Sequence, residues 1–484
     1  MTVFPEAAYF IIASRLRPGL DGGYTVSAMR RALDFERHGG VVPTILTVEF
    51  APDVDELRDE FFSIGLATPR TDMRNLYADL RANPTPLRDF ARGSGEVSPT
   101  PDDSRTEQRI SVDSSGRPWR IHTLDLDGVT RYTDYLDADG RRLLRLPFIS
   151  GRVDWHRADA QIDVFDEDEA IIGQLAGFGA LYRFWVENVV AASGFERNVV
   201  VCEAKQVGEL LAEGPRSYTL VHTVHNAHTL PPYSWDSPMD GLWGGWFDRI
   251  DDMDAVIWLT GAQRADAVRR FAEHANWVVV PHPTEPMTDR APSRERELNR
   301  VVMVARLVEQ KRVEDAIDVW PTLLERVPDA KLDIYGDGPL RSELESRITE
   351  LGLVGAVVLH GHVPDAASKL DTAAALLLTS RHEGQPLVIL EALARGCPVI
   401  AYDVHYGPAD MIENHRSGVL VEPGDGGALV EALIEVIGDR DRNSAMSAAA
   451  LEWANAHGPD VSMQLMSQLF EGLLAVEVGR VRTR

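Results

Sequence analysis

Two glutamates in the C-terminal half of the chain have a spacing that could hold a nucleotide. Glu383 and Glu391 lie eight residues apart in the segment SRHEGQPLVILE. The apolar run Ala374–Thr379 predicts a strand before this segment, and Leu387–Arg395 predicts a helix at its end. Unpaired backbone amides and the helix dipole make the start of such a helix a site for a phosphate group. The residues at this start are Gly384, Gln385, Pro386, Leu387 and Val388.

The two glutamates occupy different positions in this prediction. Glu383 lies in the loop at the carboxyl end of the strand. Glu391 lies about one turn inside the helix, where a carboxylate can accept hydrogen bonds from two neighbouring ribose hydroxyls. Taken alone, the spacing favours a simpler interpretation, which is a capped surface helix with two solvated glutamates.

Two cations, Arg306 and Lys311, follow the predicted strand Arg300–Ala305 in the segment RLVEQK. Cations at the carboxyl end of a strand can neutralise a diphosphate that gains charge as it leaves. Only four of the 49 basic residues are lysines, so a lysine inside such a pattern is not expected from abundance. The alternative is that these cations form surface salt bridges with Glu309 or Glu314.

Two further segments belong to the same pattern. YGDGPL at 335–340 predicts a turn with two glycines between a strand and a helix, and GCPVIA at 396–401 predicts the start of another strand. We expect these segments, the cations and the glutamates to lie along one edge of a parallel sheet. Ligands of such sheets bind at the carboxyl ends of the strands.

The elements that must position these residues form two α/β domains with parallel sheets that face a cleft. The first domain is expected at 1–283 and the second at 284–458, with a C-terminal helix at 460–478 that packs back on the first. A glycine turn with Gly22 and Gly23 follows the first strand, where α/β sheets usually bind ligands. The strands expected in the second domain are Arg300–Ala305, Lys331–Tyr335, Ala356–His360, Ala374–Thr379, Pro398–Ala401 and Gly418–Val421.

A β-rich insertion is expected in the first domain, at about 70–165. Three D-x-x-G turns recur there with a period of 12 residues, and Asp and Gly favour hairpin turns. The pattern predicts a β-meander, followed by a helix at Ile171–Val190. A calcium loop is disfavoured because the carboxylate at the twelfth position is absent. The turns are Asp113–Gly116, Asp125–Gly128 and Asp137–Gly140.

Composition narrows the class of protein. The 484 residues are 44% hydrophobic and 26% charged, as in globular proteins, and contain no apolar run of about 18 residues that would predict a membrane span. The net charge of −26 disfavours nucleic acid as a partner. Cys202 and Cys397 are too few for a disulfide framework or a zinc site, which favours a reduced cytoplasmic setting.

In this order and spacing, RLVEQK, YGDGPL, the glutamate pair and GCPVIA resemble the nucleotide-sugar domain of retaining GT-B glycosyltransferases of family four. The resemblance covers nearly all of the chain. The turn with Gly22 and Gly23 is similar to the family's acceptor-side glycine loop, which also approaches the donor phosphate. The resemblance implies the GT-B fold, which is two Rossmann-like domains, here with a β-meander inserted in the first.

A subgroup of the family is also suggested. The segment DVHYGPAD at 403–410 and the β-rich insertion are similar to the branch that contains teichoic-acid α-glycosyltransferases and serine-rich-protein O-GlcNAc transferases. The H-x-x-H of that branch matches His225 and His228, so a histidine here would contact the donor sugar or phosphate. The alternative is that both histidines simply line the end of a strand.

The resemblance implies transfer of glucose or N-acetylglucosamine from a UDP-sugar to a hydroxyl of a polymer or protein acceptor, with retention. Arg306 and Lys311 would stabilise the departing diphosphate. Glu383 and His225 would orient the sugar, and Glu391 would hold the ribose. No metal or other cofactor is required, because cations and dipoles stabilise the leaving group.

Two other functions are weighed against this one. A non-catalytic partner of a sister enzyme is disfavoured because all four charged site residues are present. A sugar phosphorylase would need a pyridoxal-phosphate lysine, and neither Lys331 nor Lys369 lies in a suitable motif. We expect a cytoplasmic protein, free or at the inner face of the membrane.

The meander carries two further expectations. An exposed sheet edge there predicts a homo-oligomer. Six arginines of the meander could form a basic track for an acceptor, although an alternating solvated face is favoured. These arginines are Arg117, Arg120, Arg131, Arg141, Arg142 and Arg145.

Overall fold

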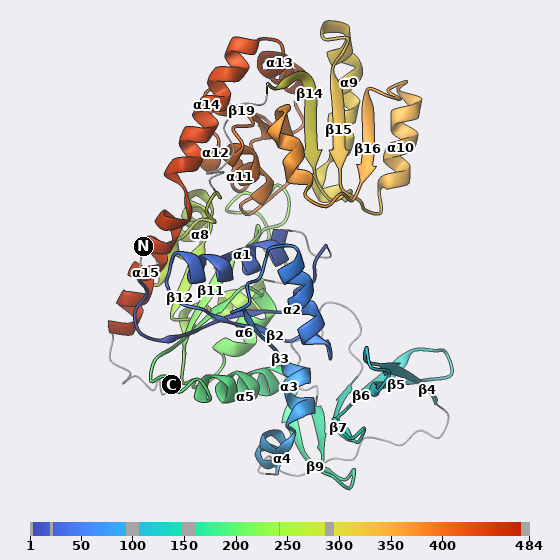
Figure 1. Ribbon diagram of the computed structural model, residues 1–484, viewed down its shortest axis with the longest axis vertical. Coiled ribbons are helices and arrows are strands. Elements are labelled where there is room, and N and C mark those ends of the chain that lie inside the picture. The colour runs from blue at the N-terminus through green and yellow to red at the C-terminus, as the bar shows by residue number, and fades with distance from the viewer. Residues whose placement is uncertain are drawn as a thin grey trace. The chain divides into compact units, whose positions relative to one another are not determined.

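The computed structural model divides into two compact units (Figure 1). The first contains Met1–Thr223, Gly241–Val256 and Ser467–Arg484, and the second contains Val224–Asp240 and Ile257–Met466. His225 and His228 therefore belong to the same unit as Lys311 and Glu383. The residues that the structure describes are 3–19, 23–92, 106–147, 161–241, 243–285 and 295–475.

The first sheet has seven strands in the order β13-β12-β11-β10-β1-β2-β3. β1 (Ala8–Ala13) pairs in parallel with β10 (Asn198–Cys202) and β2 (Thr44–Thr47). Five of its six residues are buried, as expected for a strand that is covered on both faces. The other strands are β3 (Asp72–Asn75), β11 (Thr219–Val224), β12 (Ala255–Trp258) and β13 (Trp277–Val279). The helices of this part are α1 (Gly23–Arg37), α2 (Val54–Ser63), α3 (Leu76–Ala82), α4 (Thr85–Ala91), α5 (Gly177–Ala191), α6 (Lys205–Ala212), α7 (Gly244–Asp248), η2 (Ile250–Asp252) and α8 (Gly261–Phe271).

The second sheet has six strands in the order β16-β15-β14-β17-β18-β19, and every neighbouring pair is parallel. All six strands predicted for this domain are confirmed, with ends that differ by up to three residues. They are β14 (Glu297–Val304), β15 (Lys331–Tyr335), β16 (Val357–Gly361), β17 (Ala373–Leu378), β18 (Val399–Tyr402) and β19 (Gly418–Val421).

Two apolar cores lie against the second sheet. Side chains of α9, α10 and α13 belong to one core, and side chains of η4, α11 and α14 belong to the other. Covering both faces of the sheet leaves the ends of its strands as the place for a ligand. The helices are η3 (Glu309–Lys311), α9 (Val313–Arg326), α10 (Arg341–Glu350), η4 (Ala366–Asp371), α11 (Leu387–Ala394), α12 (Pro408–Met411), α13 (Gly426–Ile437), α14 (Arg440–Ala456) and α15 (Pro459–Ala475).

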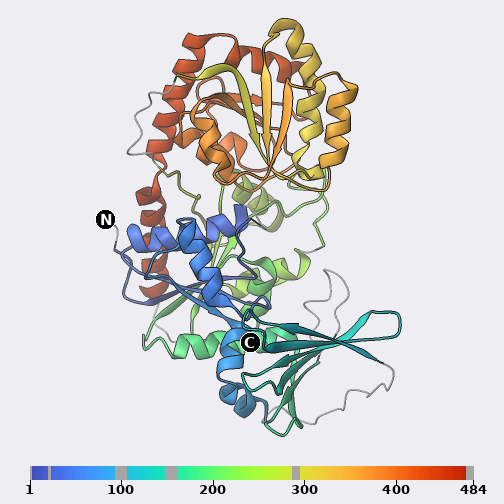
Figure 2. The same cartoon turned by 45° about the vertical axis from the view of Figure 1, so that its right-hand side comes forward.

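A third, antiparallel sheet has the order β4-β5-β6-β7-β8-β9, and its teal strands are seen side by side in Figure 2. The three predicted D-x-x-G turns are confirmed. In the turn at Asp113–Gly116, the Asp113 carboxylate accepts from the amides of Ser115 and Arg117, and Gly116 has a φ of 82°. The strands are β4 (Glu107–Val112), β5 (Pro118–Leu124), β6 (Thr130–Leu136), β7 (Arg142–Pro147), β8 (Gln161–Phe165) and β9 (Ile171–Ala176).

Two expectations for this region are wrong. The antiparallel sheet occupies 107–176 rather than 70–165, because β3 belongs to the first sheet. The helix expected at Ile171–Val190 begins only at Gly177, since 171–176 forms β9. The sequence signal was hidden because the turn between β8 and β9 has Glu169 in the position of the glycine, with a φ of 61°. The acidic run Asp166–Asp168 is therefore part of a fourth hairpin turn.

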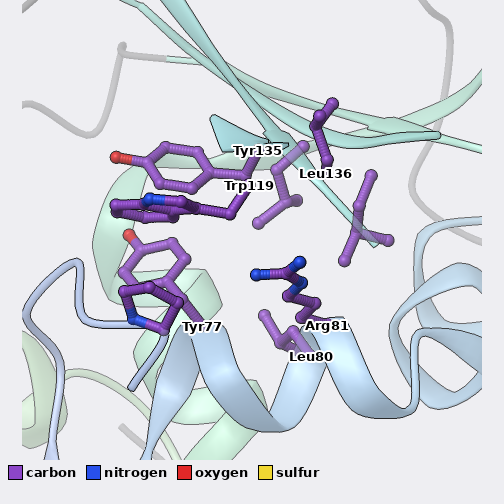
Figure 3. Close-up of a pocket in the computed structure, with 9 residues that line it drawn as sticks. Tyr77, Leu80, Arg81, Trp119, Tyr135 and Leu136 are labelled. Atoms are coloured by element: carbon purple, nitrogen blue, oxygen red, sulfur yellow. The ribbon is translucent and has the colours of Figure 1, made fainter. Parts of the chain in front are cut away.

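An aromatic stack joins this sheet to the rest of the first unit. The ring of Tyr135 on β6 stacks on Phe50 at 4.6 Å and on Tyr77 of α3 at 4.8 Å, and Trp119 lies 5.8 Å from it. Figure 3 shows Tyr77, Trp119 and Tyr135 together beside Arg81, around the small pocket that they line. Arg81 also forms a 3.1 Å ion pair with the turn residue Asp113. Side chains of the meander therefore pack on α3.

The arginines of the meander do not form an unopposed basic track. Five of the six form ion pairs, and Arg120 packs over Trp119 at 4.5 Å and donates to Ser111. Their charges are therefore offset by neighbouring carboxylates, as the alternative of a solvated face implies. The pairs are Arg117–Asp113, Arg131–Asp125, Arg141–Asp139, Arg142–Glu169 and Arg145–Asp134.

The C-terminal helix α15 contributes to the core of the first unit. Phe470 lies 5.2 Å from both Phe4 and Tyr9 and 6.0 Å from Phe35, measured between ring centroids. Its side chain is fully buried. Among the described helices, none combines the length and apolarity that crossing a membrane requires.

Candidate functional site

Lys311 and Glu383 form an ion pair at the carboxyl ends of β14 and β17. The Lys311 Nζ lies 2.5 Å from the Glu383 Oε1, and only 16% and 10% of the two side chains are exposed. The structure thus brings together two predicted site residues that lie 72 positions apart in the sequence. The proposed alternative for Lys311, a surface salt bridge to Glu309 or Glu314, is wrong.

Hydrogen bonds connect the loop that carries Lys311 to the loop that carries Glu383. The amide of Arg381 donates to the Gln310 carbonyl at 2.7 Å, and the Gln310 side-chain amide donates to the His382 carbonyl at 2.9 Å. The Thr379 hydroxyl donates to the Arg312 carbonyl at 2.8 Å. The position of Lys311 relative to Glu383 is therefore fixed by both backbone and side-chain contacts.

Gly384 packs against the chain that follows β11. A Cβ atom at this position would lie 2.1 Å from the His225 carbonyl oxygen and 3.1 Å from the Asn226 Cα. The His225 ring stacks on His282 at 5.6 Å, and the His282 amide donates to the Gln385 side chain at 2.7 Å. Three distant segments therefore meet at the start of α11, and His282 was not among the site residues predicted from the sequence.

The start of α11 retains unused hydrogen-bond donors. The Glu383 amide donates to the His405 carbonyl and the Ile389 amide donates to the Pro386 carbonyl. Over the described residues, the four amides between them that could face a phosphate donate no hydrogen bond, namely those of Gly384, Gln385, Leu387 and Val388. Glu391 lies in the second turn of α11 and is partly buried. The predicted anion site at this helix start therefore has its donors available.

Arg306 is the second predicted cation, and it follows β14 on the same loop. Its side chain is exposed, and within the described ranges it forms no ion pair. The turn after β15 packs on this loop, because the Leu307 amide donates to the Asp337 carbonyl at 2.9 Å. A Cβ atom at Gly336 would lie 1.9 Å from the Ala305 carbonyl oxygen, which explains the glycine there.

Two predicted features lie elsewhere. Gly396-Cys397-Pro398 precedes β18, so it lies at the amino edge of the parallel sheet and not at the carboxyl edge with Lys311 and Glu383. Cys397 is fully buried there. Gly23 begins α1 in the first unit, and Gly22 lies outside the described residues.

The segment DVHYGPAD at 403–410 is hydrogen-bonded to the backbone of Glu383. The Tyr406 amide donates to the Glu383 carbonyl at 3.0 Å, and its hydroxyl donates to Asp266 of α8 at 3.1 Å. The Asp410 carboxylate accepts from the amide of Ala262 at 3.3 Å, at the start of α8, while burial raises the pKa of Asp410. This motif therefore connects α8 to the loop of Glu383.

His228 is placed differently from His225. It is fully buried and lies against Trp258 and Tyr406, with ring centroids 6.0 Å and 6.2 Å apart. Burial, with a smaller effect of the Arg270 charge, lowers the pKa of His228 to about 4. His228 is therefore neutral at physiological pH.

We expect the burial of His228 to make stability depend on pH. An unfolded histidine titrates near 6.5, so between about pH 6.5 and 4 the unfolded chain binds one proton more than the folded chain. Acidification through this window should lower the free energy of unfolding by up to about 1.4 kcal/mol per pH unit. Urea unfolding from pH 7 to 4.5 should show a smaller slope for His228→Gln, and an unchanged slope for the exposed control His362→Gln. Equal slopes in wild type and His228→Gln would contradict this prediction.

The chemistry that this region offers is recognition of an anion that carries hydroxyl groups. It combines an exposed arginine, a lysine–glutamate pair and the amide donors of a helix start. Among the residues that the structure describes, no cluster of three His, Cys, Asp or Glu side chains suited to a metal ion occurs.

The chain is similar to known glycosyltransferases over part of its sequence. Residues 287–453 match the family model described as Glycosyl transferases group 1. The poly(glycerol-phosphate) alpha-glucosyltransferase of Bacillus subtilis (strain 168) is 25% identical over 311 residues, which cover 63% of this chain and 43% of that protein. The UDP-N-acetylglucosamine--peptide N-acetylglucosaminyltransferase GtfA subunit of Streptococcus gordonii is 26% identical over 231 residues, which cover 46% and 45%. The chain thus matches less than half the length of either relative.

A solved structure extends the similarity to nearly the whole chain. TarM of S. aureus, as a mutant in complex with Fondaparinux, alpha-GlcNAc-glycerol and UDP, superposes with a TM-score of 0.78 at 17% identity. The superposition covers 97% of this chain and 100% of that chain. It shows that the chain has the GT-B fold, as the sequence predicted.

Proposed function

We propose that this chain, whose residues 287–453 match the glycosyl transferases group 1 family, transfers a hexosyl group from a UDP-sugar to an acceptor hydroxyl with retention. The observation that carries the proposal is the partly buried pair of Lys311 and Glu383 beside the unused amides of the α11 start. A cation, a carboxylate and several N–H donors in one place suit a diphosphate joined to a sugar.

The proposed step requires little of the protein beyond orientation and charge. The bond from the anomeric carbon to the β-phosphate oxygen breaks, while the acceptor oxygen bonds to the same face of that carbon. The acceptor proton passes to the departing phosphate oxygen. Arg306 and Lys311 would offset the charge that develops on the diphosphate, and Glu391 would hold the ribose. Glu383 and His225 would orient the sugar.

The names of similar proteins suggest the substrates. The Bacillus subtilis relative is an alpha-glucosyltransferase of poly(glycerol-phosphate), and the Streptococcus gordonii relative acts on a peptide with UDP-N-acetylglucosamine. We therefore propose glucose or N-acetylglucosamine as the sugar, in α-linkage, and a polymer or protein hydroxyl as the acceptor. A cytoplasmic location is part of the proposal, since Cys202 and Cys397 are buried free thiols.

Self-association through the meander also belongs to the proposal. β4 is a terminal strand of its sheet, and Ile110 and Val112 on it are 55% and 56% exposed. An exposed apolar edge strand can pair with another copy of the chain. Sedimentation velocity should therefore show an oligomer that Ile110→Lys/Val112→Lys converts to a monomer. A wild-type monomer at micromolar concentration would refute this part.

A release assay for the nucleoside diphosphate tests the activity directly. The purified chain is mixed with UDP-, GDP- and ADP-sugars without an acceptor, and slow release is expected from UDP-glucose or UDP-N-acetylglucosamine alone. Addition of EDTA should leave the rate unchanged, because cations and a helix start replace the metal. If none of the sugar nucleotides releases its nucleoside diphosphate and UDP causes no thermal shift, the result would instead favour a non-catalytic partner of a sister enzyme. Loss of activity with EDTA would contradict the metal-free step.

A further inference from the structure

A hollow of about 480 Å³ lies in the second unit beside the ion pair of Lys311 and Glu383. Its size falls within the range of small-molecule sites, which is about 300–1,000 Å³. The residues that matter for its chemistry are Tyr233, Arg312, Arg381, Asp403, His405 and Glu422. They come from segments that are far apart in the sequence, and none of them belongs to the proposed donor site.

The hollow is adjacent to the proposed chemistry. Arg312 follows Lys311 directly, and Arg381 precedes Glu383 by two residues. The backbone carbonyl of His405 accepts a 2.9 Å hydrogen bond from the Glu383 amide. A molecule in the hollow would therefore lie next to the residue that is proposed to orient the donor sugar.

Tyr233 forms a prepositioned aromatic wall of the hollow. Its backbone has a φ of 69°, which is rare for a bulky residue, and its amide donates to the Leu230 carbonyl at 2.9 Å. Such backbone conformations persist where the surroundings hold them, and they concentrate at binding sites. The Tyr233 ring packs on His382 at 4.5 Å, and a bridge between Thr229 and Met239 closes the segment around it.

The charges that line the hollow sum to zero when His405 is neutral. Arg312 and Arg381 contribute two positive charges, and Asp403 and Glu422 contribute two negative charges. Both guanidinium groups also have carboxylate partners, so neither is an unopposed site for a phosphate. The pairs are Arg312–Asp315 at 2.6 Å and Arg381–Glu314 at 3.9 Å.

An aromatic face with both donors and acceptors around it suits a neutral sugar ring. The C–H face of a hexose can pack on the Tyr233 ring and on the neighbouring prolines 231 and 232. Its hydroxyl groups can donate to Asp403 or Glu422 and accept from a guanidinium. We infer that this hollow binds a neutral sugar unit of the acceptor, an inference that rests on the proposed transferase function.

Ligand-observed saturation-transfer NMR on the full chain loaded with UDP tests the inference. The probes are methyl α-D-glucopyranoside, methyl N-acetyl-α-D-glucosaminide and sn-glycerol 3-phosphate. At least one neutral glycoside should receive saturation, and Tyr233→Ala should weaken its binding about tenfold, as expected for loss of an aromatic anchor. Tyr233→Phe keeps the ring and should bind as the wild type does.

A second variant keeps the inference testable if Tyr233→Ala does not fold. Asp403→Ala removes an exposed acceptor of the hollow and should also weaken binding of the glycoside. The exposed control Arg347→Ala on α10 should not. A thermal shift by UDP verifies that each variant is folded.

Three results would overturn the inference. They are saturation of glycerol 3-phosphate alone, binding that neither Tyr233→Ala nor Asp403→Ala weakens, and displacement of the glycoside by UDP-glucose, which would make the hollow part of the donor site. The release assay tests the transferase function separately from these results. If the chain binds the glycoside but cleaves no UDP-sugar, the sugar-binding site is supported and the transferase function is refuted.

Discussion

Replacing either Lys311 or Glu383 by alanine should abolish most of the sugar transfer. The loss of a group that stabilises the developing charge costs on the order of 10²–10³-fold in rate. Each single substitution also leaves the other charge buried without its partner, since the two side chains are only 16% and 10% exposed. Unpaired charges cost about 3–5 kcal/mol of stability when they are fully buried, and this value is the upper bound for the part-buried pair here. The rate is measured by release of UDP, and stability is measured by urea unfolding.

A double-mutant cycle separates the ion pair from the effects of each side chain. The variant Lys311→Ala/Glu383→Ala should be more stable than the sum of the two single substitutions predicts, because it leaves neither charge without its partner. The matched control is the exposed pair Arg326–Glu431, with side chains 56% and 66% exposed, whose coupling should stay below about 1 kcal/mol. Normal turnover in either alanine variant would refute the assignment of the site.

The second large effect is expected from Gly384→Ala. The new methyl group would lie 2.1 Å from the His225 carbonyl oxygen, so the backbone at 225–226 or the start of α11 must move. Overpacking of this kind costs about 1–3 kcal/mol. A displacement of about 1 Å in a positioning loop can cost on the order of 10²-fold in rate. The variant should therefore lose more activity than its modest loss of stability would explain.

Gly472→Ala on α15 provides the matched control for this substitution. A Cβ atom at Gly472 meets no atom within 4 Å, so alanine there should only raise helix propensity. We expect normal activity and equal or higher stability for it. Full activity of Gly384→Ala would show that the contact between Gly384 and His225 does not position the site.

The arrangement of the second sheet could be predicted from the sequence, because each strand is short, apolar and bounded by polar turns. Strands of this kind alternate with helices, and β15 and β19 have the predicted ends. The same rule places Lys311 and Glu383 at carboxyl ends of strands. Lys311 and Glu383 lie close together because the neighbouring parallel strands β14 and β17 end at the same edge of the sheet.

Features that depend on a partner far along the chain could not be predicted in this way. β9 is an apolar run of six residues that also fits a helix start, and only its pairing with β8 makes it a strand. His225 and His228 are three residues apart, yet one is partly exposed and the other is fully buried. Burial of a side chain is decided by what packs over it, which local spacing does not encode.

Two α/β domains with parallel sheets, the charged residues after strand ends and the glycine turns could be predicted from the residues alone, and the resemblance of the motifs implied the GT-B fold. These follow from local periodicity, turn chemistry and the order of motifs along the chain. The folded structure was needed to show that Lys311 pairs with Glu383, that His282 stacks on His225, and that carboxylates offset the arginines of the meander. Those contacts join residues that are distant in sequence, so their energies exist only once the chain has folded.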